Sequence, residues 1–509
     1  MRYVLLTTLL VGAGCAHYQM ACPVAGGPQW IEATSTHFTM RTDLPAADAE
    51  KMLRDDEDTL ARFEQVADFF LPPATTMGRT SLVVIAQQWE YRKLITPADS
   101  GYGFVEVGRL APHDERGRPT IALTTETRAA EVFRHELAHR LLHQRVGVVP
   151  QWLDEGFAEY FSVLPAVDGK IALGGPTLRL IQYNNGSQRS EEINTAHFYA
   201  EPTMELKEML QHDKQYSYSN VGYFEAWLIV HYLANGAPED ADKFRHFLLA
   251  LVDGQPWEQA LVSDYGPVPA IAVASRAHLM QMSGNKTLQW FIRYTPPPPS
   301  AWHVAVRVLD DGEVHHLKAS LLPATEDEEL KLATRHAPKS AELHRWAANR
   351  AAAQHDDATA EREISKAITL TNDPFYRFER ARIHIDRELR KPEAERHLET
   401  LQDEVRAVAK YANEPQQLAT LAHYYELTHD YTFGTTLGAR AVAMDPRCTS
   451  CLVTLAGLYF ASGKLDDATA TLESAVKVWP EKKVPTEVTE RLKQFRCASA
   501  REKGAACAP

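Results

Sequence analysis

HELAH at His135–His139 and WLDEGFAE at Trp152–Glu159 are the most informative stretches of this chain. Two histidines four residues apart lie on one face of a helix, so the imidazoles of His135 and His139 can reach the same metal ion. Glu136 would then stand beside the open coordination position, where a carboxylate can take a proton from water. The first stretch therefore predicts a metal-assisted hydrolytic site.

Both stretches have a helical context. Apolar residues over 127–145 recur with the period of a helix, and Pro150 stands where a second helix can begin. On that second helix Glu155 and Glu159 are again four residues apart, so their carboxylates point the same way. A catalytic zinc site needs three protein ligands, and Glu155 is the best third ligand. Glu159 is better placed to hold a ligand histidine in its tautomer.

Residues 135–160 resemble the gluzincin (peptidase MA-like) zinc metallopeptidases, relatives of thermolysin and the zinc aminopeptidases. Their second motif, W-L-x-E-G-x-A-E-Y, is filled at every fixed position by Trp152–Tyr160. The interval between His139 and Glu155 is shorter than in thermolysin or the aminopeptidases, which argues against those two subfamilies. The resemblance implies an α+β, thermolysin-like zincin domain that binds one Zn²⁺ and hydrolyses peptide bonds.

The resemblance also assigns roles. Glu136 would act as general base and return the proton to the leaving amine. Residues 223–233 resemble the helix that carries a tyrosine in the zinc aminopeptidases, so Tyr223 would donate a hydrogen bond to the oxyanion. The lysine and glycine usual after this tyrosine are replaced by Glu225 and Ala226. Tyr216 and Tyr218 remain competitors, and so does a packing role for Tyr223.

Other segments are consistent with such a domain. The sequence predicts an opening strand near residues 30–40, a helix over 46–70, a buried strand over 81–86 and an edge strand over 120–123. Residues 239–252 and 256–262 are expected to form its closing helices. We place this peptidase domain at residues 28–295.

The first 22 residues predict export. A basic start, a short apolar run and small residues before Cys15 are typical of a secretory signal, and the run is too short to span a bilayer. Residues 12–15 resemble a bacterial lipobox, with Gly12 where leucine is usual. Lipidation of Cys15 would anchor the protein to a membrane of the bacterial cell envelope, in the periplasm or at the outer membrane. The alternative is plain secretion after cleavage nearby.

Charge and cysteine content agree with this location. The net charge of -13 offers no basic surface for nucleic acid. In an oxidising compartment, the spacing of four C-terminal cysteines favours disulfides over a structural zinc set or a redox motif. These cysteines are Cys448, Cys451, Cys497 and Cys507.

The second half of the chain has a different pattern. Residues 296–329, which begin in a proline run, are interpreted as a linker or ambiguous segment. Residues 330–485 show helix pairs with a period near 34 residues and resemble an all-α tetratricopeptide solenoid of about four repeats. A cysteine-containing tail, 486–509, follows. Such arrays commonly hold a peptide or protein partner, although a helical buttress that binds nothing is the alternative.

Two hypotheses follow. The chain is either a zinc peptidase that acts on a peptide or protein substrate in the cell envelope, or a non-catalytic tetratricopeptide adaptor that uses the peptidase fold as a scaffold. Retention of the general base Glu136 favours the first hypothesis. Substrate, and endopeptidase against aminopeptidase action, stay open because fold analogy does not determine them.

Overall fold

The structure is a computed structural model. It describes residues 22–71, 78–95, 108–111, 114–116, 118, 120–125, 129–147, 149–175, 220–236, 240–284, 290–293, 295, 298, 302–446, 448–479 and 484–504. The lipidation candidate Cys15 and the cysteine Cys507 lie outside these residues. So do Tyr216 and Tyr218.

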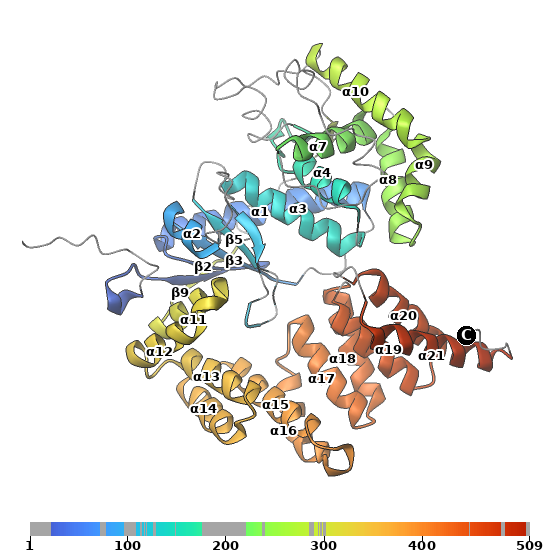
Figure 1. Cartoon of the computed structure of the whole chain (residues 1–509). Coiled ribbons are helices and arrows are strands. Elements are labelled where there is room, and N and C mark those ends of the chain that lie inside the picture. Colours follow the sequence, from blue (N-terminus) through green and yellow to red (C-terminus); the bar gives the residue numbers. More distant parts are fainter. Residues whose placement is uncertain are drawn as a thin grey trace, which may run out of the picture.

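A mixed sheet forms the centre of the N-terminal half (Figure 1). Within the described residues it has six strands in the order β4-β5-β3-β2-β1-β9. The pairs β2–β3 and β3–β5 are parallel and the other pairs antiparallel. The strands are β1 (Ile31–Thr34), β2 (Phe38–Thr42), β3 (Thr80–Ile85), β4 (Gly108–Ala111), β5 (Thr120–Thr124) and β9 (Ala305–Val308).

Helices cover both faces of this sheet. Leu82 and Val84 of β3 belong to the main core with residues of α1 (Ala46–Phe70) and α3 (Ala129–Arg145). Val83 and Ile85, which point the other way because strand side chains alternate, pack with α2 (Gln88–Ile95) and α11 (Asp311–Leu321). A strand buried on both faces reads as a continuous apolar run, as observed at β3.

The chain beyond α3 adds a helical layer and a small sheet. α4 packs closely on α7, and a Cβ atom at Gly156 of α4 would stand 2.3 Å from the carbonyl oxygen of Ala226 on α7. The glycine therefore sets how near these helices approach. The elements are α4 (Gln151–Phe161), β6 (Ala166–Val167), β7 (Lys170–Leu173), α7 (Asn220–Asn235), α8 (Asp240–Val252), α9 (Trp257–Tyr265), α10 (Val268–Gly284) and β8 (Trp290–Arg293).

The structure is of the α+β class that the sequence predicts. The helix over 46–70, the buried strand near 81–86 and the two helices bearing the motifs are found at the expected places. Three segments differ. The opening strand predicted near residues 30–40 is two antiparallel strands, β1 and β2. β5 is not at an edge, because β4 pairs with its outer side. Part of segment 296–329 also belongs to the sheet: β9 pairs with β1, and α11 follows it.

The C-terminal half is helical. α17 and α19 begin at Pro415 and Thr449, and their partners α18 and α20 begin at Tyr431 and Leu465, so both intervals equal 34 residues (449 − 415 and 465 − 431). In Figure 1 the helices of this half follow a curve that begins beside α11, beneath the sheet. They are α12 (Glu326–His336), α13 (Ala341–Ala353), α14 (Asp357–Leu370), α15 (Pro374–Leu389), α16 (Gln402–Ala409), α17 (Pro415–Leu427), α18 (Tyr431–Met444), α19 (Thr449–Ala461), α20 (Leu465–Lys477) and α21 (Thr486–Glu502).

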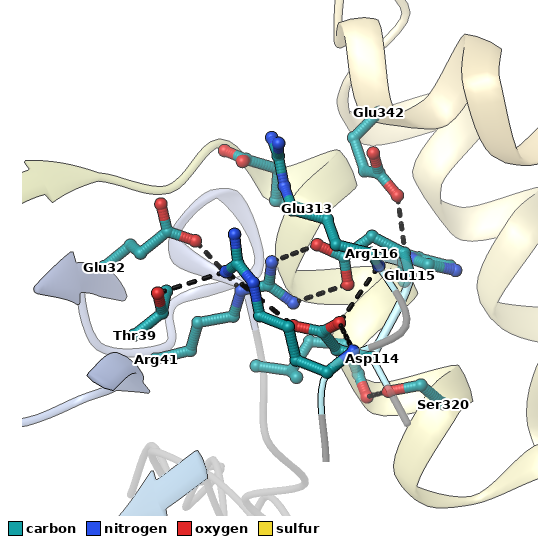
Figure 2. A network of polar contacts seen from close by, with 12 residues as sticks. Glu32, Thr39, Arg41, Asp114, Glu115, Arg116, Glu313, Ser320 and Glu342 are labelled. Atoms are coloured by element: carbon teal, nitrogen blue, oxygen red, sulfur yellow. Dashed lines mark hydrogen bonds and ion pairs between the residues drawn. The ribbon is translucent and has the colours of Figure 1, made fainter. Parts of the chain in front are cut away.

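A network of ion pairs joins the two halves (Figure 2). Arg41 of β2 extends to Glu115, which lies in the connection between β4 and β5, and also contacts Glu32 of β1 at 3.1 Å. From the same connection, Arg118 Nε contacts Glu414 Oε1 at 2.7 Å, just before α17. Both members of this last pair are buried, so the pair is part of the interface rather than of the surface.

The described cysteines fall into two groups. Cys448 and Cys451 form a disulfide that spans the start of α19, and Cys497 is also disulfide-bonded. Cys22 is a buried free thiol. Among the described helices, none has the length and apolar character that crossing a membrane requires.

Candidate metal centre

Two crossing helices form the candidate site. His135 and His139 lie on successive turns of α3, and their ring centroids are 4.7 Å apart. Glu155 of α4 faces both rings. Both histidines are buried and Glu155 is only partly exposed. The three predicted ligands therefore converge on one place.

The spacing of their donor atoms fits a metal ion. The two histidine Nε2 atoms are 3.1 Å apart, and Glu155 Oε2 lies 3.5 Å from each. Ligands of tetrahedral zinc at about 2.0–2.1 Å are separated by about 3.3 Å. In addition, Glu155 Oε2 is buried and has no hydrogen-bond partner among the described residues. Its nearest polar neighbours among the described residues are the two histidine Nε2 atoms at 3.5 Å, so a cation between the three atoms would contact all of them.

Electrostatics keep Glu155 ionised. Burial alone would raise the pKa of its carboxyl, but the neighbouring His135 and His139 outweigh burial and lower the pKa to about 2. The ligand set thus consists of two imidazoles and a carboxylate, a combination suited to zinc.

Asp154 is a site residue that the sequence analysis missed. Its Oδ1 lies 2.7 Å from His139 Nδ1, and its Oδ2 lies 2.8 Å from His143 Nε2. Burial raises the pKa of Asp154 and lowers that of His139, but their mutual attraction outweighs burial in both, so the Asp154 pKa falls and the His139 pKa rises. A carboxylate on Nδ1 leaves His139 Nε2 directed at the ligand cluster. The sequence feature that could have indicated Asp154 is its position directly before Glu155 in the second motif.

Glu159 lies behind the other histidine. It is fully buried, and its Oε1 is 3.5 Å from His135 Nδ1. Each ligand histidine consequently has its own carboxylate neighbour on α4. His143 is half-exposed; its Nε2 contacts Asp154 at 2.8 Å, and its ring centroid lies 6.0 Å from that of His139.

The two predicted catalytic side chains are also at the site. Glu136 follows His135 on α3 and is nearly buried. The Tyr223 ring on α7 lies edge-on to the His135 ring, with centroids 6.1 Å apart. α7 is held in this position by its close approach to α4 at Gly156. The geometry thus groups a carboxylate, a phenol and three ligand atoms.

Part of the chain matches a known family. Residues 129–258 match the model of a family described as "Protein of unknown function (DUF1570)". The matched segment begins at the first residue of α3 and contains α4, α7 and α8, so it includes every residue of the site described above. A comparison with curated proteins finds no match.

Proposed function

We propose that this chain is a zinc-dependent peptide-bond hydrolase of the gluzincin type, with His135, His139 and Glu155 as ligands. The observation that carries the proposal is the convergence of their donor atoms at 3.1–3.5 Å, with Glu155 Oε2 lacking any other described partner. Zinc bound there would supply an activated water and polarise the substrate carbonyl.

The remaining chemistry belongs to the chain itself. The Glu136 carboxylate would accept the proton of the attacking water and pass it to the leaving nitrogen. Tyr223 would donate its phenolic hydrogen to the carbonyl oxygen as negative charge develops there. Asp154 would hold the His139 imidazole in position through Nδ1, and Glu159 would place a carboxylate beside Nδ1 of His135, at 3.5 Å. Glu136 and Glu159 are buried, and low exposure strengthens electrostatic interactions.

The finer fold assignment belongs to the same proposal. A thermolysin-like zincin domain is supported by the order of β5, α3 and α4 and by their motifs. A tetratricopeptide solenoid is supported by the 34-residue recurrence of α17–α18 in α19–α20. We propose that this half docks a substrate or protein partner. The cell envelope is the proposed location, with Cys15 as lipid anchor.

The adaptor hypothesis does not require a catalytic site. A scaffold without catalysis has no need for a buried general base beside a complete ligand set, yet Glu136 lies next to His135 and is nearly buried. We therefore retain the adaptor only as the alternative.

The decisive experiment compares metal content with cleavage of a mixed peptide library, read by mass spectrometry. Glu136→Gln should keep its zinc and lose at least about 100-fold in cleavage rate. Glu155→Ala should lose zinc from this site and all cleavage. Glu131→Gln is the matched control, because Glu131 lies five residues earlier on α3 and is exposed to 8%, against 9% for Glu136. Full cleavage by Glu136→Gln, or unchanged zinc in Glu155→Ala, would overturn the proposal.

A further inference from the structure

A second group of donor atoms lies on the other side of the sheet, away from the candidate site. Cys22 directly precedes a short 3-10 helix, Pro23–Ala25, while His315 lies on α11 and His336 is the last residue of α12. Cys22 and His315 are buried, and their donor atoms and that of His336 all lie within 4.8 Å of one another. Three distant segments of the chain thus bring one thiol and two imidazoles together.

The separations resemble those of the first site. His315 Nε2 lies 3.0 Å from His336 Nδ1, and Cys22 Sγ lies 3.4 Å from the same nitrogen. Tetrahedral zinc, with about 2.0–2.1 Å to nitrogen and about 2.3 Å to sulfur, separates two nitrogens by about 3.3 Å and nitrogen from sulfur by about 3.5 Å. The observed values are close to both.

The orientation of His315 is fixed from behind. Its Nδ1 lies 2.7 Å from Glu329 Oε2, and the other oxygen of Glu329 contacts Lys318 Nζ at 2.7 Å. A carboxylate on Nδ1 makes that nitrogen the protonated one, so the bare Nε2 points at His336 and Cys22. This carboxylate–histidine arrangement is the usual support of a metal-bound imidazole.

Hydrogen bonds through His336 Nδ1 do not connect all three groups at once, although the Cys22 thiol also has the Asp311 carboxylate as a neighbour. His336 Nδ1 faces both His315 Nε2 and Cys22 Sγ, and a ring nitrogen carries either one proton or one lone pair. If it is protonated, it can donate well to only one of the two. If it is bare, it accepts from the thiol but meets the lone pair of His315 Nε2 at 3.0 Å. A cation between the three atoms satisfies all of them.

We propose that Cys22, His315 and His336 form a second metal site, which binds Zn²⁺ through one thiolate and two imidazoles. The site would tie the N-terminal segment to α11 and α12, which lie between the sheet and the C-terminal helices, and its three protein ligands would leave the fourth tetrahedral position to water. The mixed sulfur and nitrogen donors select zinc over magnesium or calcium, which take oxygen ligands.

Cobalt substitution tests this site directly in the full chain. The protein is stripped of metal, loaded with Co²⁺ and examined for the thiolate-to-cobalt charge-transfer band in the near ultraviolet. The first site has no sulfur ligand, and Cys448, Cys451 and Cys497 are in disulfides. The band should therefore be present in the parent, absent in Cys22→Ser and unchanged in Glu155→Ala. No band in the parent, or a band that survives Cys22→Ser, would overturn the proposal.

Zinc stoichiometry separates this proposal from the proposed function. We expect about two zinc ions per chain in the parent, and about one in Cys22→Ser, His336→Ala or Glu155→Ala. The buried pair His231 and His278, with Nδ1 and Nε2 2.8 Å apart, is the matched control. His278→Gln should leave the zinc content unchanged. Zinc equal to the parent in both Cys22→Ser and His336→Ala would contradict the second site alone.

Discussion

At the scale of single residues, Asp154 contacts two histidines, one of which is a proposed metal ligand. One carboxylate is shared by His139 and His143, at 2.7 and 2.8 Å, and this sharing directs the His139 ring. The bond to His139 supports the ligand, whereas the bond to His143 only steadies Asp154. The two bonds therefore have separable consequences.

Asp154→Ala should weaken zinc binding at the first site by about 10–100-fold, because His139 loses the group that holds its tautomer and orientation. A competition titration with a chromophoric chelator measures this, in a Cys22→Ser background that removes the second site. His143→Ala is the control and should change the affinity less than about threefold, since it leaves the 2.7 Å contact to His139 intact. Equal losses in the two variants would contradict this assignment.

The ligands could be predicted from sequence because their geometry is local. His135 and His139 share a helix face whatever surrounds it, and Glu155 follows from its motif. The carboxylate that contacts each ligand histidine cannot be predicted in the same way, because it depends on how α3 and α4 cross. Glu159 was predicted for this role and lies 3.5 Å from His135 Nδ1, whereas Asp154 makes the closer contact to His139. Helix periodicity carries no information about that crossing.

At the scale of elements, the contact between α4 and α7 determines where Tyr223 stands. α4 provides Glu155 and α7 provides Tyr223, and the two helices touch at Gly156, where a Cβ would overlap the Ala226 carbonyl oxygen at 2.3 Å and the Val230 side chain at 2.7 Å. The glycine of the motif thus has a packing reason that is separate from chemistry.

Gly156→Ala should lower the free energy of unfolding by about 1–3 kcal/mol, because backbone atoms cannot yield to the added methyl. Gly438→Ala is the control: Gly438 also lies within a helix, but its nearest neighbour is the Leu455 side chain at 3.3 Å. There the higher helix propensity of alanine offsets the contact. Chemical denaturation followed by circular dichroism measures both. Similar midpoints for the two variants would argue against the close approach.

The pairing partners of strands are also difficult to predict from the sequence. Residues 80–85 are recognisable because β-branched residues form a short apolar run bounded by polar ones. β9 alternates weakly and is exposed along its length, so nothing local identifies its partner. Its register with β1, Ile31 opposite Val308, joins residues from opposite ends of the N-terminal half. Only tertiary structure reveals such a pairing.

At the scale of the whole molecule, buried ion pairs connect the sheet to the C-terminal helices. Arg118 and Glu414 form the clearest pair, and Arg118 Nη1 also donates to Thr39 Oγ1 at 3.0 Å. Both charges are buried, and Arg118 Nε to Glu414 Oε1, at 2.7 Å, is the closer of the two ion pairs that Arg118 makes with described residues, the other being to Asp114 at 3.9 Å.

Arg118→Ala should destabilise the protein by about 3–5 kcal/mol, because it leaves the Glu414 carboxylate buried without its partner. Arg118→Met combined with Glu414→Leu should recover most of this loss, since both members of the pair are removed and Asp114, 3.9 Å from Arg118, still has Arg41 as a neighbouring charge. The exposed pair Lys51 and Asp55 is the control, and Lys51→Ala should change stability by less than about 1 kcal/mol. Denaturant midpoints of the parent, Arg118→Ala, the double variant and Lys51→Ala measure these changes in stability. A double variant as unstable as Arg118→Ala would contradict the explanation.

Acid should weaken the same region through Glu342 of α13. Burial alone would raise the pKa of this carboxyl, but Arg345 and His316 lower it to about 2 from an ordinary 4.5. The unfolded chain thus binds the proton more readily, and the stabilisation present above about pH 4.5 is lost as the pH falls toward about 2.

Urea unfolding at about pH 5 and about pH 3 measures this dependence. Glu342→Gln should reduce the difference between the two midpoints. Glu490→Gln is the control, because Glu490 lies in an exposed pair with Lys493, and it should behave as the parent does. An unchanged difference in Glu342→Gln would show that the acid sensitivity arises elsewhere.

The pairing of β9 with β1 also fixes an order of events during biosynthesis. β1 stands early in the chain, yet its outer edge stays without its partner until residues 305–308 have been made. Until then an open strand edge is exposed, and such edges template aggregation. Contacts between residues so distant in sequence also slow folding. The first half of this protein therefore completes its sheet only when the ribosome has begun the second.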